Sequence, residues 1–295
     1  MDSPPATVPL ALRWRFRLEY AIVRALAALI GALGVRASAA LSGALWRWVA
    51  PLLPRHRRAQ NNLARSMPHL GAEERRRILA GMWDNLGRTF AEFFHLRALI
   101  DGGRLQVEDP AAFAALAARP GLVACAPHMG NWETLGAYAL QQGATVAGVY
   151  RELSNPLVER FVFNRRAPFY PAGLLPKSAM AARRLVKQAR AGGIIAFLAD
   201  QRDSRGIASP FFGRLAPSTP FPAFVARSLD LPLCAMRVLR LPGSRFSLRV
   251  QEIPVPRTED RDADVRAATA ALQACFEGFI REAPEQWMWA HKRWG

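Results

Sequence analysis

The stretch Gly121-Leu-Val-Ala-Cys-Ala-Pro-His-Met-Gly-Asn-Trp-Glu133 joins a short apolar run to two side chains that can move protons. The run Leu122–Ala126 consists of small and apolar residues, which is typical of a strand buried on both faces. Pro127 ends it, and the Gly-Asn pair that follows the histidine permits a turn and a helix start. We therefore predict a strand that delivers His128 in the turn at its end, and a helix that delivers Glu133.

The spacing of five between His128 and Glu133 limits how these side chains can meet. On a straight helix, five residues rotate a side chain through about 500°, or about 140° net. The two side chains can therefore touch only if His128 lies in the turn and curls back over the helix start. His69 and Glu74 show the same spacing, but no apolar strand precedes them and charged residues follow. That second copy predicts the solvated start of a helix.

The rest of the chain alternates short apolar runs with amphipathic stretches. The alternation predicts an α/β protein with a mixed central sheet flanked by helices. Asp200 and Asp203 follow one predicted strand directly, at the sheet edge where ligand sites collect. We expect strands over 145–150 and 194–199, a hairpin of 232–241 and 244–255, helices over 156–166, 178–190, 219–229 and 262–282, and loops over 168–176 and 209–213.

The chain of 295 residues is strongly basic, with 40 Lys and Arg against 23 Asp and Glu, a net charge of +17. Such a surface attracts polyanions, namely nucleic acid, anionic lipid or an acidic protein. No zinc-finger spacing, aromatic RNA platform or heptad-linked basic region is present, so nucleic acid is not expected as a partner. The three cysteines are far apart and lack metal-ligand spacing, so we expect reduced thiols, no metal centre and no cofactor.

Residues 18–48 are rich in Ala and Leu and are interrupted by arginines. The longest uncharged run, 25–35, is eleven residues, whereas a membrane span needs about twenty. Two amphipathic helices lying on a bilayer fit this pattern, and a pair of core-packing helices is the alternative. The basic run 55–58 would add attraction to anionic headgroups. We predict a membrane-associated helical extension over 1–58 and an α/β domain over 59–295.

Several motifs together resemble the late, or secondary, acyltransferases of lipid A biosynthesis, within the larger glycerolipid acyltransferase group. That group carries a histidine, four residues and an acid, here His128 and Glu133 (HX4E). The likeness covers nearly the whole chain. Its further blocks are Val149-Tyr-Arg151 with Asn155-Pro156, Asn164-Arg-Arg166, Ala199-Asp-Gln201 with Asp203, Phe211-Phe-Gly213, and Pro284-Glu-Gln-Trp287-Met-Trp289 before His291-Lys-Arg-Trp294.

The resemblance implies transfer of a fatty acyl chain from an acyl-carrier-protein thioester to a hydroxyl of a lipid A precursor. Histidine is suited to deprotonate that hydroxyl, because its unperturbed pKa of about 6.5 lies near working pH. His128 would be the general base, with Glu133 bonded to its other ring nitrogen. Arg166 would stabilise the oxyanion of the tetrahedral intermediate, with Arg165 as the neighbour that could be confused with it.

The remaining site residues have supporting roles by the same resemblance. Arg151 and Asn155 would bind acceptor phosphate or shape the site. Asp200 and Asp203 would order the arginines. The acyl chain needs an apolar pocket, for which the candidates are Phe211, Phe212 and Phe221.

The implied partners are an acyl carrier protein, a glycolipid acceptor and anionic lipids of the bacterial inner membrane. The protein would lie on the cytoplasmic face, peripheral or monotopic. One alternative is an acyltransferase for another lipid, such as a phosphatidylinositol mannoside or a lysophospholipid, using acyl-CoA. The other is a non-catalytic basic membrane-binding protein.

Overall fold

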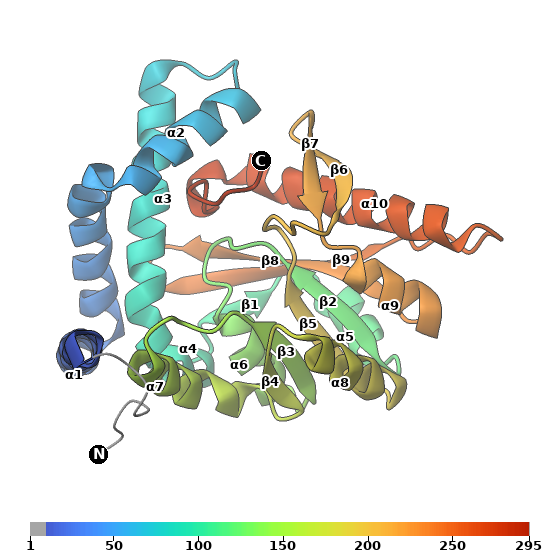
Figure 1. Ribbon diagram of the computed structural model, residues 1–295, viewed down its shortest axis with the longest axis horizontal. Helices are drawn as coiled ribbons and strands as arrows, with labels where there is room; N and C mark the ends of the chain where they lie inside the picture. Colours follow the sequence, from blue (N-terminus) through green and yellow to red (C-terminus); the bar gives the residue numbers. More distant parts are fainter. Residues whose placement is uncertain (1–9, 295) are drawn as a thin grey trace.

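A seven-stranded mixed sheet forms the centre of this computed structural model, which describes residues 10–294 (Figure 1). In sheet order the strands are β1 (Leu105–Val107), β9 (Arg245–Ile253), β8 (Leu233–Leu241), β2 (Leu122–Ala126), β5 (Ile194–Leu198), β3 (Val146–Tyr150) and β4 (Gly173–Pro176). The strands from β8 to β4 run parallel to one another, and β9 and β1 run in the opposite direction. The predicted α/β class is confirmed, and so is the predicted hairpin of β8 and β9.

Helices cover both faces of this sheet (Figure 1). Alternate side chains of β2 point to opposite faces: Val123 packs into the main core, and Ala124 into a smaller cluster with Leu116. The first face is covered by α8 (Ala179–Arg190), α9 (Phe221–Leu229) and α10 (Arg261–Glu282), and the second by α4 (Leu96–Asp101), α5 (Pro110–Ala117) and α6 (Thr134–Gln141). The carboxyl ends of the neighbouring parallel strands β2 and β5 lie side by side at one edge of the sheet.

The N-terminal helix α1 (Leu10–Val49) packs along α3 (Ala72–Glu92) at one side of the sheet (Figure 1). It is broken at Gly34, whose φ of 69° and ψ of 169° are not helical, so it consists of two helical segments as the sequence predicted. The contact with α3 is close, since a Cβ at Gly87 would lie 2.6 Å from the Ser42 carbonyl oxygen. α2 (Pro54–Ser66) follows, and the predicted domain boundary after residue 58 falls inside it and stays a prediction.

One side of α1 is apolar and exposed. The region Leu12–Leu52 is long and apolar enough to cross a membrane by length and composition. Its most apolar 18-residue window has a mean hydropathy of 1.8, and 6% of that window is buried. Length therefore permits a span, whereas the interrupting arginines favoured a surface position. Its exposed apolar side chains include Trp14, Leu18, Ile22, Leu29, Leu41, Leu45 and Trp48.

Two segments predicted as loops contain strands. β4 lies within 168–176 and is a short edge strand that begins at glycine and ends at proline, so its sequence carries no strand pattern. β6 (Ile207–Phe211) and β7 (Arg214–Ser218) form a separate antiparallel hairpin. Its turn residues Phe212 and Gly213 both have positive φ, at 52° and 68°, as a tight hairpin turn requires. Packing of β6 against α10 outweighs the weak local propensity.

Candidate active site

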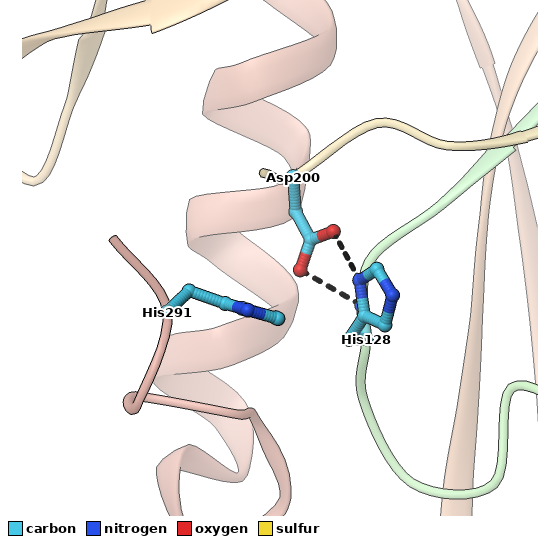
Figure 2. A group of neighbouring side chains, drawn as sticks. All are labelled: His128, Asp200 and His291. Atoms are coloured by element: carbon cyan, nitrogen blue, oxygen red, sulfur yellow. Dashed lines mark hydrogen bonds and ion pairs between the residues drawn. The ribbon is translucent and has the colours of Figure 1, made fainter. Parts of the chain in front are cut away.

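His128 and Asp200 meet at the carboxyl ends of the neighbouring strands β2 and β5. The register pairs Ala126 with Leu198, so the residues two positions beyond each strand come side by side. The His128 ring nitrogen Nδ1 lies 2.7 Å from Asp200 Oδ1, and the His128 backbone N–H donates to Asp200 Oδ2 at 2.8 Å (Figure 2). Asp200 is fully buried, whereas the His128 side chain remains 13% exposed. The Asp200 carboxylate is therefore enclosed by the protein, whereas part of the His128 ring remains accessible to solvent.

Asp200 is held as a carboxylate. Burial alone would raise its pKa, but the charge of His128 and the hydrogen bond from its ring outweigh burial and keep the pKa of Asp200 well below its ordinary value. Trp287 Nε1 also donates to Asp200 Oδ2, at 2.8 Å. A carboxylate can only accept, so Nδ1 of His128 carries a proton and Nε2 is free to accept one. The Gln201 amide nitrogen lies 3.2 Å from that Nε2.

Glu133 contacts Arg166 and not His128, which corrects the predicted dyad. Arg166 Nε and Nη2 donate to the two Glu133 oxygens at 2.9 and 2.7 Å. The backbone turn directs His128 towards β5, while Glu133 lies just before α6 and faces α7 (Pro156–Arg166). Burial lowers the pKa of Arg166 and Glu133 raises it, with a net increase, so the guanidinium stays charged. Asp200 therefore takes the orienting position predicted for Glu133.

Arg165 and Arg166 point to different neighbours. The Arg165 guanidinium lies 3.7 Å from the centre of the Phe161 ring. Burial and the nearby charge of Arg24 on α1 lower the pKa of Arg165. Arg166 is the one that reaches Glu133, next to the loop that carries His128. The structure thus shows that Arg166, and not Arg165, pairs with Glu133, a distinction that the sequence left open.

The loop after β2 is fixed from two sides. Met129 pairs with Trp287 in an isolated antiparallel bridge, and Gly130 N–H donates to the Gln286 carbonyl at 3.0 Å. On the α3 side, Thr89 Oγ1 donates to the Gly130 carbonyl at 2.9 Å. Gly130 has φ of 58°, and a Cβ there would lie 1.8 Å from the Val238 carbonyl oxygen, so only glycine fits. The C-terminal segment therefore holds the histidine loop, a role that its aromatic and basic composition did not reveal.

Asn155 forms all its hydrogen bonds within the protein, which corrects the prediction that it binds the acceptor phosphate and leaves the alternative that it shapes the site. Its Oδ1 caps α7 by accepting from the N–H groups of Leu157 and Val158, at 3.0 and 3.4 Å. Its Nδ2 donates to the Phe16 carbonyl and to Glu19 Oε2 on α1, at 3.0 and 2.8 Å. Asn155 therefore ties α7 to α1.

The acidic residues do not order the arginines as predicted. Asp200 holds His128, and Asp203 pairs with Lys177 at 3.3 Å. Arg151 is exposed directly after β3, with no ion pair recorded among residues 10–294. Of the two residues predicted to bind the acceptor phosphate, Arg151 and Asn155, only Arg151 is thus available to an external anion.

Phe211 and Phe212 fill the core and do not line an acyl pocket. They are 0% and 4% exposed, and their rings pack against the C-terminal tryptophans, with Phe211 5.8 Å from Trp287 and Phe212 5.5 Å from Trp289 between ring centres. Phe221 differs, because it lines a surface groove of about 390 Å³ beside α8. Of the three phenylalanines, Phe221 therefore meets open space.

Three side chains lie close enough together to hold a metal ion, although their positions in the sequence show no metal-ligand spacing. The ligand atoms of His128, Asp200 and His291 lie within 4.8 Å of one another (Figure 2). However, Asp200 already accepts three N–H bonds, and the charges of Arg293 and Arg55 act on the same space. A metal would have to break the bond to His128 Nδ1 and enter a positive field. The donor set fits an acid–base pair better than a metal centre.

His291 is a buried neutral neighbour of His128 that sequence reasoning missed. Its ring centre lies 4.9 Å from that of His128, and within residues 10–294 its Nε2 has no hydrogen-bond partner. Burial, reinforced by the charge of His128, lowers the pKa of His291 to about 3. The histidine-containing tail after the Trp-Met-Trp block was the one sequence signal that could have drawn attention to it.

The sequence profile of the bacterial lipid A biosynthesis acyltransferase family matches residues 13–295. The chain belongs to this family. Among curated proteins it is similar to a phosphatidylinositol mannoside acyltransferase of Mycolicibacterium smegmatis, with 26% identity over 247 residues, 80% of this chain and 78% of that protein. The lipid A acyltransferase resemblance drawn from the motifs is confirmed, and the protein is an O-acyltransferase. The non-catalytic alternative is set aside.

Proposed function

We propose that this acyltransferase moves a fatty acyl chain from an acyl-carrier-protein thioester to a hydroxyl of a lipid A precursor, with His128 as general base. The observation that carries the proposal is the 2.7 Å contact between His128 Nδ1 and a buried Asp200 carboxylate, which leaves Nε2 on the partly exposed side of the ring. An imidazole held in this tautomer is the arrangement that activates a hydroxyl nucleophile in many acyl-transfer enzymes.

The reaction then needs no covalent enzyme intermediate. The acceptor hydroxyl displaces the Gln201 amide from His128 Nε2 and gives its proton to that nitrogen as its oxygen attacks the thioester carbonyl. Asp200 stabilises the imidazolium that forms. When the intermediate collapses, the C–S bond breaks and the proton passes from His128 to the leaving thiolate, so that ester and free thiol are formed.

The Glu133–Arg166 pair acts as a second unit beside the base. Glu133 fixes Nε and Nη2 of Arg166, and among residues 10–294 no recorded hydrogen bond uses Nη1. A guanidinium anchored on one edge presents its remaining donors at a fixed place, which is what an oxyanion requires. The acid of the HX4E pattern thus serves the reaction through Arg166. Arg151, exposed at the end of β3, is assigned to the acceptor phosphate.

The exposed apolar surface of α1 supports a position of this site at a membrane. Its exposed apolar side chains, edged by arginines, suit the cytoplasmic face of the bacterial inner membrane and its anionic lipids. Family members are bacterial and membrane-associated, which agrees with this assignment.

A second acceptor deserves equal testing, because the similar M. smegmatis protein is a phosphatidylinositol mannoside acyltransferase. Purified protein would receive a radiolabelled acyl chain on carrier protein or on CoA, with a lipid A precursor, a phosphatidylinositol mannoside or a lysophospholipid as acceptor. We expect label in the lipid A precursor, from the carrier protein in preference to CoA. Labelling of only the mannoside or only the lysophospholipid would overturn the proposed acceptor. Equal transfer from the carrier protein and from CoA would overturn the proposed donor.

A further inference from the structure

The surface of α8 and the start of α9 form a basic groove with an apolar floor. The groove has a volume of about 390 Å³. Its floor is Ala182 and Val186 of α8 with Phe221 at the first position of α9, and its rim is formed by Arg183, Lys187 and Arg190. The spacings of four on the floor and of four and three on the rim place each set along one line of the helix.

The charge on this surface is of one sign. α8 carries four cations and α9 one, Arg227, and neither helix contains an acidic residue. Arg227 is held by Asp264 at 2.6 Å, whereas within residues 10–294 no salt bridge is recorded for the four cations of α8. The other side of α8 is committed to the core through Ala181, Leu185 and Ala189. The groove therefore combines unpaired positive charge with exposed apolar surface.

The groove is also close to the reacting histidine. Phe221 contacts the ring of Phe197 on β5 with 5.8 Å between centres. Phe197 precedes Asp200 by three residues, which span at most about 10 Å at 3.3 Å per residue. A protein docked over α8 could thus deliver a thioester on a flexible arm to His128.

We propose that this α8–α9 groove is the docking surface for the acidic acyl carrier protein, a refinement that rests on the proposed function. A membrane surface would also be attracted by the four cations. However, α1, which carries the exposed apolar side chains, lies on the opposite side of the molecule from α8 and α9 (Figure 1). A bilayer in contact with α1 would leave the groove free for a soluble acidic partner, whose carboxylates pair with the rim while an apolar side chain covers the floor.

The test compares two double charge reversals that change the net charge equally. Arg183→Glu with Lys187→Glu alters the groove, and Arg76→Glu with Arg77→Glu alters the exposed start of α3, where these side chains are 70% and 79% exposed. The readout is kcat/KM with the acyl carrier protein thioester, divided by kcat/KM with the same acyl chain on free pantetheine. Membrane binding of each variant is measured by sedimentation with anionic vesicles.

The groove variant should lower this ratio by about tenfold or more, which is the scale of reversed electrostatic steering. The α3 variant should leave the ratio near that of the unmodified protein, and both should sediment with vesicles. Equal ratios for the two variants, or loss of vesicle binding by the groove variant alone, would overturn the docking surface. If the unmodified protein transfers from no donor, the proposed function fails instead, so the two failures are distinct.

Discussion

The turn at His69 and the loop at His128 have the same sequence spacing to an acid, yet the structure gives them opposite surroundings. His69 is exposed between α2 and α3, and Glu74 pairs loosely with Arg77 at 3.9 Å. His128 is largely buried and contacts a carboxylate 72 residues away in sequence. A histidine becomes a useful base when a second group fixes its other nitrogen, and strand register rather than local spacing supplies that group here.

The largest expected effect separates these two regions. Replacing His128 by Ala removes the general base, which typically costs about 10²–10⁴ in rate, or about 3–5 kcal/mol of barrier. His69→Ala alters an exposed turn and should change stability or barrier by less than about 0.5 kcal/mol. Single-turnover acyl transfer by each folded variant measures the difference. Equal losses would show that the wrong histidine carries the reaction.

The Glu133–Arg166 pair sharpens the comparison, because it gives the acid of the HX4E pattern a partner other than histidine. Arg166→Lys loses the planar fork that Glu133 holds in two bonds, and should reduce kcat by about 10²–10³ with a smaller change in KM. Glu133→Gln should also be severe, and the double variant little worse than Arg166→Lys, since the residues act as a unit. Near-normal turnover of Arg166→Lys would remove this pair from the mechanism.

His291 provides a stability test of the region around His128. The pKa of His291, about 3, lies below the ordinary 6.5. Below pH 6.5, His291 therefore becomes protonated in the unfolded chain while it stays neutral in the folded protein. Stability conferred by His291 is thus present above pH 6.5 and falls as pH drops, by about 2 kcal/mol between pH 7 and pH 5 at about 1.4 kcal/mol per pKa unit. Urea unfolding at both pH values should show a smaller loss for His291→Gln than for the unmodified protein. Identical losses would contradict a buried neutral His291.

A single substitution on the apolar face of α1 should have the smallest effect, a weaker partition into vesicles. Leu29 is 54% exposed on α1, and Leu215 is 68% exposed on β7. Leu29→Gln should weaken vesicle partition by about tenfold, since burial of a leucine contributes about 1.5–3 kcal/mol. Leu215→Gln is the matched control and should leave partition unchanged. A point substitution is preferred to deletion of 12–58, because α1 packs closely on α3. Equal behaviour of the two variants would argue against α1 as the membrane contact.

Local sequence patterns predicted much of the fold, because they report local interactions. The strand Leu122–Ala126 and the helix Pro156–Arg166 were predicted at these positions and are confirmed. The hairpin of β6 and β7 was missed, because its strands are stabilised by α10 and the C-terminal aromatic residues rather than by their own propensity.

The candidate site was predicted less completely, because its contacts are long-range. His128 was correctly placed after a buried strand, but its partner depends on the register of β2 against β5 and on Trp287 from the C-terminal segment. Helix geometry permits Glu133 to reach a His128 that lies in the turn, but local spacing contains no information that Arg166 binds Glu133 instead. The position of Asp200 directly after a parallel strand was the available signal, and it was assigned to the arginines instead.

The most direct test of the central claim is the acyl-transfer rate of Asp200→Asn, alone and combined with His128→Ala. The Asp200 Oδ2 position must accept from the His128 backbone N–H and from Trp287 Nε1, so an asparagine would keep its oxygen there and turn its amide N–H towards His128 Nδ1. The proton of the imidazole would then move to Nε2, and the base would be lost. We expect a fall of about 10⁴, as for the wrong tautomer in a serine protease triad, with the double variant no slower than His128→Ala. Full activity of Asp200→Asn, or losses that multiply in the double variant, would contradict the account.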